Sequence, residues 1–126
     1  MLTPTIVATS NGTPNISIDC IFYDGVVSRT ESDEYVRIVN AGETSVDLSY
    51  WSLKDVADGS PTFTFPGYTI AQNETIRVYT NEVHSESGGF SFGRGSSIWA
   101  NSEPDTAALF NAQGQEVSRK SYPPSC

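Results

Sequence analysis

The chain repeatedly alternates polar and apolar residues over short runs, and turn-forming residues separate these runs. In the segment NISIDCIFY (15–23), the alternate apolar positions are Ile16, Ile18, Cys20 and Phe22. A two-residue period of this kind is typical of a β-strand with one buried face. No segment shows the 3.6-residue period of an amphipathic helix. The sequence therefore predicts an all-β fold.

Further strands are predicted wherever Val, Ile, Thr, Tyr and Phe cluster between turn signals. These segments are 34–40, 46–55, 62–65, 74–80, 106–111 and 115–122, the last two forming a terminal hairpin. About seven to nine short strands joined by regular turns are typical of an immunoglobulin-like antiparallel β-sandwich. In 46–55 the apolar positions change parity after Leu48, so we predict a β-bulge near Ser49 and Tyr50.

The length of 126 residues suits one domain with one hydrophobic core. We expect an N-terminal linker at 1–14, the sandwich at 15–122 and a C-terminal tail at 123–126. The core is expected to contain the inward-facing apolar residues of the strands. These are Val36, Ile38, Leu48, Trp51, Leu53, Phe63, Phe65, Ile76, Val78 and Leu109.

The formal net charge of −8 limits the classes of partner. A polyanion such as DNA is repelled, and no stripe of Lys and Arg offsets that repulsion. No apolar run reaches the 18 residues that would indicate a membrane-spanning helix. The acidity suits an extracellular or cell-surface location, or a cationic partner. Residues 1–15 do not form an intact signal peptide, so we expect a signal sequence to have been removed or to lie outside this chain.

The two cysteines, Cys20 and Cys126, leave one possible disulfide, which would close nearly the whole chain. In an oxidising compartment we expect this bridge. The alternative is that Cys20 is a buried thiol, because it shares the parity of Ile16 and Ile18.

Clustered carboxylates before the second strand form a candidate cation site, in which Asp24, Glu31 and Asp33 would bind Ca²⁺. The spacing does not match an EF-hand loop. The alternative is a solvated turn, in which Asp33 caps backbone amides and Glu34 pairs across strands with Arg37 or Arg77. On this second interpretation the chain needs no cofactor.

His84 and Trp99 are two further candidate functional residues. His84, the only histidine, would be needed for a Ser-His-Asp set, but the chain has no G-x-S-x-G nucleophile motif, so a solvated loop position is expected. Trp99 is a candidate for a sugar-binding surface, with a core position as the alternative. In GGFSFGRGSS (88–97), the phosphate-binding Gly-Lys-Ser/Thr is absent, and we expect Phe90 and Phe92 to anchor the loop.

An ordered series of motifs resembles the lamin-tail domain. The matching segments are YDG (23–25), ESDEYVRIVN (31–40), VDLSYWSLKD (46–55), IRVYTN (76–81), SIWAN (97–101) and DTAALFNAQGQEV (105–117). The family usually has Gly before the tryptophan of the third strand, where this chain has Tyr50. The heptad rod, nuclear-import run and prenylation box of nuclear lamins are absent.

The resemblance implies an immunoglobulin-like domain of the kind found in prokaryotic secreted proteins. The implied function is a non-enzymatic interaction or tethering module of a larger secreted or cell-surface protein, with a protein or a neighbouring domain as partner. The alternative is a carbohydrate- or Ca²⁺-binding accessory module of a secreted hydrolase.

Overall fold

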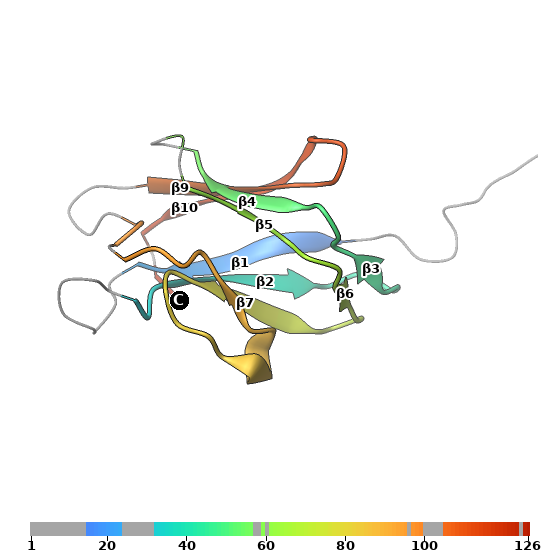
Figure 1. Ribbon diagram of the computed structural model, residues 1–126. Coiled ribbons are helices and arrows are strands. Elements are labelled where there is room, and N and C mark those ends of the chain that lie inside the picture. Colours follow the sequence, from blue (N-terminus) through green and yellow to red (C-terminus); the bar gives the residue numbers. More distant parts are fainter. Residues whose placement is uncertain are drawn as a thin grey trace, which may run out of the picture.

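The computed structural model describes residues 15–23, 32–56, 59, 61–95, 97–99, 105–123 and 125–126. Within these residues the chain forms ten strands, three of them only two residues long, and a short 3-10 helix, η2 (Ser85–Ser87). Two four-stranded sheets lie one above the other (Figure 1). The protein is therefore an all-β sandwich, as predicted.

The first sheet has the order β1-β2-β7-β8. Its strands are β1 (Ile16–Phe22), β2 (Tyr35–Asn40), β7 (Thr75–Tyr79) and β8 (Phe90–Ser91). Neighbours are antiparallel except for β7 and β8, which run parallel. The second sheet has the order β10-β9-β4-β5, and all its pairings are antiparallel. Its strands are β10 (Glu116–Tyr122), β9 (Asp105–Phe110), β4 (Ser52–Asp55) and β5 (Thr62–Thr64).

The core lies between the two sheets and contains the residues that the alternation placed inward. Eight of the ten expected core residues are buried: Val36, Ile38, Leu48, Leu53, Phe65, Ile76, Val78 and Leu109. Trp51 and Phe63 are only partly buried and pack against the core from its margin. Phe90 is buried and Phe92 partly buried, so both anchor the long segment after β7 as expected.

The simple alternation expected for the first strand is wrong in its second half. A register shift between Ile18 and Cys20 forms a bulge in β1. Because a bulge inserts one residue, it reverses which parity faces the core. Ile21, which simple alternation assigned to the outer face, is completely buried, whereas Phe22 is only partly buried. The sequence alone carried no signal for this bulge.

The single bulged strand expected over 46–55 is also wrong. The chain forms two strands there, and they belong to different sheets. Strand β3 (Val46–Asp47) pairs with β6 (Thr69–Ile70), whereas β4 belongs to the second sheet. A turn joins them, in which the Trp51 amide donates to the Leu48 carbonyl oxygen at 2.9 Å. The change of parity in the sequence thus reflects a strand that changes sheets.

Tyr50 occupies the strained position of this turn. Its φ is 67°, in the left-handed region that side chains with a Cβ rarely adopt, and its side chain is 77% exposed. This is the position at which the lamin-tail resemblance calls for Gly. Tyr50 therefore adopts the left-handed backbone conformation that Gly would adopt more easily.

A disulfide and a strand contact close one edge of the sandwich. Cys20 in β1 is bonded to Cys126, with the two Cα atoms 5.0 Å apart and a sequence separation of 106. Nearby, the Ser125 hydroxyl and the Cys126 amide both donate to the Ile21 carbonyl oxygen. Further along β1, the Ile18 amide donates to the Ser118 hydroxyl of β10 at 2.9 Å. Residues 125 and 126 therefore attach to the domain through β1.

Replacing Tyr50 by Gly is expected to stabilise the protein relative to Tyr50→Ala. Both variants remove the exposed ring, but only Gly removes the Cβ that opposes a φ of 67°. We expect Tyr50→Gly to exceed Tyr50→Ala by about 1 kcal/mol in the free energy of unfolding, measured by urea denaturation. Asn73→Gly is the control, since Asn73 has the same φ region but is a residue that tolerates it. If Tyr50→Ala is as stable as Tyr50→Gly, the backbone at position 50 is not strained by a Cβ atom.

Removing the disulfide with Cys20→Ala and Cys126→Ala is expected to cost about 2–5 kcal/mol in unfolding free energy. The physical reason is that the bridge restricts a 106-residue segment of the unfolded chain. Urea denaturation of the oxidised protein and of the double variant measures the difference. A difference in unfolding free energy below about 0.5 kcal/mol would show that the disulfide adds no stability beyond the contacts between β1 and β10.

Candidate functional site

The outer face of the first sheet carries two rows of side chains that run across the strands. In one row, Phe22 of β1 lies opposite Tyr35 of β2, and Tyr35 lies opposite Tyr79 of β7. The ring centroids of each pair are 5.2 Å apart. Such cross-strand aromatic contacts are a main source of sheet stability. This aromatic row is continuous across three strands.

The second row is charged. Arg37 of β2 lies directly opposite Arg77 of β7. Like charges in directly opposed positions destabilise a sheet, by up to about 1 kcal/mol. A carboxylate lies at each end of the row: Asp19 accepts from Arg37 Nε at 2.7 Å, and Glu86 lies near Arg77. The carboxylates of Asp19 and Glu86 therefore offset the two positive charges from the ends of the row, while the arginines remain next to each other.

The Arg77 guanidinium is held in place by the aromatic row. Its Nη1 donates to the Tyr79 hydroxyl at 2.9 Å, and its Cζ lies 4.3 Å from the centre of the Tyr35 ring. The hydrogen bond to Tyr79 is the main cause that raises the pKa of Arg77, with a smaller contribution from Glu86. A guanidinium fixed in this way on an aromatic ring is a preorganised donor group.

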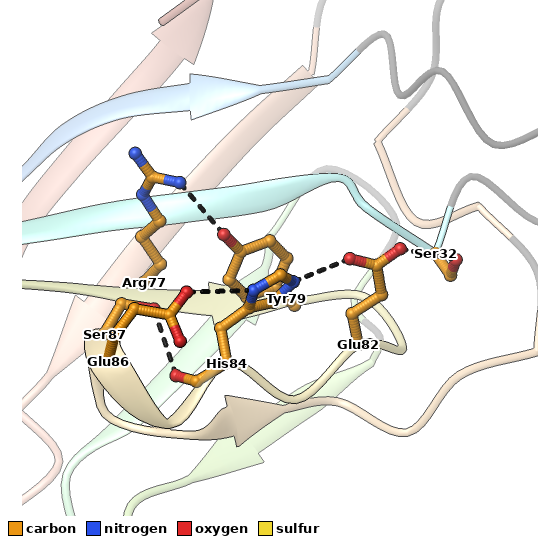
Figure 2. Close-up of polar contacts among 7 residues, drawn as sticks. All are labelled: Ser32, Arg77, Tyr79, Glu82, His84, Glu86 and Ser87. Carbon is orange, nitrogen blue, oxygen red and sulfur yellow. Dashed lines mark hydrogen bonds and ion pairs between the residues drawn. The ribbon is translucent and has the colours of Figure 1, made fainter.

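His84 covers the end of the aromatic row (Figure 2). Its ring stacks on the Tyr79 ring with centroids 4.2 Å apart. Nε2 contacts Glu82 Oε1 at 2.7 Å, and Nδ1 contacts Glu86 Oε2 at 3.1 Å. The other Glu82 oxygen accepts from the Ser32 hydroxyl at 3.3 Å. His84 lies in the loop after β7, as expected, with a side chain that is 33% exposed. Its contacts join this loop to the turn before β2, which the sequence did not predict.

These contacts define the protonation state that suits His84. Hydrogen bonds from both ring nitrogens to carboxylates require both to carry a proton, which is the cationic form. Glu82 is the largest cause of the raised pKa of His84, and Glu86 adds to it. In turn His84 helps to lower the pKa of Glu86, after that residue's own backbone amide. A histidine whose two ring nitrogens both contact carboxylates is not arranged as the general base of a Ser-His-Asp set.

An open depression lies beside this network on the outer face. Its lining combines the charged row with two hydroxyl side chains: Asp19, Arg37, Thr75, Arg77, Glu86 and Ser87. Both arginines therefore contribute to one surface hollow. The sequence offered Arg37 and Arg77 only as alternative partners of Glu34, whereas the register of β2 and β7 sets the two arginines opposite each other.

The proposed cation site lies mostly outside the described residues, since Asp24 and Glu31 belong to the 24–31 segment. Asp33 lies in a turn before β2. Among the residues that the structure describes, no group of three or more His, Cys, Asp or Glu side chains is placed to hold a metal ion. The structure thus leaves Asp24 and Glu31 as sequence-based candidates only.

Glu34 differs from its sequence-based assignment. It is completely buried, and neither Arg37 nor Arg77 pairs with it: Arg37 contacts Asp19, and Arg77 contacts Tyr79. Instead Glu34 Oε1 accepts from the Thr80 hydroxyl and the Ile98 amide, each at 2.9 Å. A buried carboxyl group whose oxygen accepts hydrogen bonds from a hydroxyl and a backbone amide is a structural anchor. Glu34 therefore ties the end of the long segment after β7 to the start of β2.

Trp99 is a core residue and not a surface one. Its side chain is completely buried, and Phe92 packs edge-on against it with centroids 6.3 Å apart. The surface position required for stacking on a sugar is therefore not available. The Glu34 contacts explain this placement, because the Trp99 amide also lies 3.4 Å from Glu34 Oε1.

The position of His84 between two carboxylates predicts a measurable pKa. We expect the pKa of His84, followed by NMR during a pH titration, to lie above its ordinary 6.5. Glu82→Gln should lower this pKa more than Glu86→Gln, because Glu82 is the larger cause. Because the folded-state pKa is raised, the stabilisation is complete below the ordinary pKa and is lost as pH rises through the folded value.

Glu116→Gln on β10 is the matched control, since Glu116 pairs with Arg119, well away from His84 in the sheet order. A pKa for His84 at or below 6.5 in the unmodified protein would contradict the ion pairs.

Comparison with known proteins identifies the family. The chain matches the family model described as Lamin Tail Domain over residues 9–124. No curated protein matches the chain. The family is immunoglobulin-like, in agreement with the two-sheet architecture, and this is consistent with a non-catalytic protein-interaction domain. No helix among the residues described is long and apolar enough to cross a membrane. With the match extending over most of its length, the chain belongs to the lamin tail domain family.

Proposed function

We propose that this lamin tail domain is a non-enzymatic interaction or tethering module of a larger secreted or cell-surface protein. The observation that carries the proposal is the outer face of the first sheet. There a continuous aromatic row adjoins two directly opposed arginines and an open depression. Aromatic residues and arginine are the side chains most enriched at the centres of protein interfaces.

The partner proposed is a protein or a neighbouring domain of the same polypeptide. The face is rigid, since its side chains belong to paired strands and Arg77 is held by Tyr35 and Tyr79. Rigid donor groups lose little conformational entropy on binding, which favours recognition. The contacts of His84 provide neither a nucleophile nor a base, and this supports a binding role for the network.

The extracellular or cell-surface location rests on the disulfide. Cys20 and Cys126 are bonded in the structure, and such bonds persist in oxidising compartments. The net charge of −8 also suits a secreted protein. A carbohydrate-binding module is not favoured, because Trp99 is buried.

Site-specific photo-crosslinking of the full-length protein in its host would test the proposal. A benzoylphenylalanine at Thr75, which lines the depression, is expected to yield a discrete adduct with a protein or neighbouring domain outside the cytoplasm. The same probe at Thr62, an exposed threonine of β5 in the other sheet, is the matched control.

Equal crosslinking at Thr75 and Thr62, or none at Thr75, would overturn the assignment of the interaction to this face. Recovery of the adduct only from the cytosol would overturn the proposed location.

A further inference from the structure

The arginine pair of the depression has donor groups left over from its own contacts. Arg37 uses Nε toward Asp19, and Arg77 uses Nη1 toward Tyr79. Each guanidinium carries five N–H groups. Within the described part of the chain no further hydrogen bond from either guanidinium is found, and both arginines line the depression.

The opposed position of the two arginines points to a ligand. Asp19 and Glu86 balance the two like charges only from the ends of the row, and a shared anion between the arginines would reduce their repulsion further. We propose that this depression binds the carboxylate groups of an acidic segment of a partner protein, with Arg37 and Arg77 as the two donors. This inference deepens the proposed interaction function and rests on it.

The existing acidic neighbours do not block such binding. Asp19 is 44% exposed and Glu86 is 74% exposed, so their contacts are surface contacts that contribute little to stability. An incoming carboxylate can displace Asp19 from Arg37 at small cost. Arg77 needs no rearrangement, because Tyr79 and Tyr35 already hold its guanidinium. Arg77 is therefore the preorganised half of the site and Arg37 the exchangeable half.

The aromatic row favours a carboxylate over a neutral sugar. Stacking on a sugar needs an uncovered ring face. The Tyr79 ring carries His84 on its face and the Tyr35 ring carries the Arg77 guanidinium. These rings position the charged groups and leave hydrogen bonding as the mode of recognition.

The net charge of −8 does not exclude an acidic partner. At physiological ionic strength the field of distant charges is screened beyond about 8 Å, whereas bidentate contacts act at hydrogen-bond distance. The long-range repulsion slows association and disfavours polyanions that lack a fitting pair of carboxylates. Short-range geometry at the two arginines then decides which segment binds.

An NMR titration of the oxidised 126-residue chain with acetyl-(Glu)₄-amide tests the proposal. Saturable shifts are expected at Arg37, Arg77 and Thr75, with none from acetyl-(Gln)₄-amide. The double variant Arg37→Gln/Arg77→Gln should weaken binding by at least about tenfold. Arg119→Gln/Lys120→Gln on β10 removes the same two charges and should bind as the unmodified protein does. Arg37→Lys/Arg77→Lys keeps the two charges but loses the planar guanidinium groups, so its binding should also be weaker. Amide shifts outside the depression that match those of the unmodified protein show that each variant is folded.

Each other outcome overturns the inference. If no saturable shifts appear, the depression does not bind carboxylates. If Arg37→Gln/Arg77→Gln and Arg119→Gln/Lys120→Gln weaken binding equally, the peptide responds only to the overall charge of the protein. Tighter binding of an oligogalacturonate than of the peptide would assign the site to acidic polysaccharides instead. If the Thr75 crosslink persists in Arg37→Gln/Arg77→Gln, the interaction function stands and the carboxylate assignment fails.

Discussion

The antiparallel pairing of β2 with β7 is the constraint on which the rest of the structure depends. Its register places Val36 opposite Val78 and Ile38 opposite Ile76, and all four side chains are completely buried. A slip of one residue would turn them outward, so the core holds the register in place. The same register necessarily sets Arg37 opposite Arg77 on the outer face. Burial of the apolar side chains on the inner face of the sheet thus determines which charged side chains lie opposite each other on its outer face.

Two long-range links hold the remaining segments on this framework. The buried carboxylate of Glu34 receives the Ile98 amide and the Thr80 hydroxyl, which brings the long segment after β7 back to the start of β2. The Cys20–Cys126 disulfide joins the last residue to β1. One link acts by satisfying polar groups in a low-dielectric interior and the other by restricting the unfolded chain. Both connect residues more than 60 positions apart in sequence, at 64 for Glu34 and Ile98 and 106 for the cysteines.

Local pattern predicted the strands well but not their irregularities. The alternation in 34–40 and 74–80 predicted β2 and β7, with Val36, Ile38, Ile76 and Val78 facing inward. The bulge in β1 and the change of sheets after β3 were not predictable in this way, because each depends on the neighbouring strand. Glu34 was misassigned for the same reason. Nothing near it in sequence shows that a backbone amide 64 residues away will satisfy its charge.

The sequence by itself determined the fold class, the inward positions of the regular strands and the membership suggested by the ordered motifs, since these follow from local periodicity and turn chemistry. Only the tertiary structure decided the candidate site. Arg37 and Arg77 are 40 positions apart, and they meet because burial of the apolar side chains of β2 and β7 selects one register out of several that the two strands could adopt. His84 likewise gained its role from packing, because the loop after β7 folds back and places its ring on Tyr79.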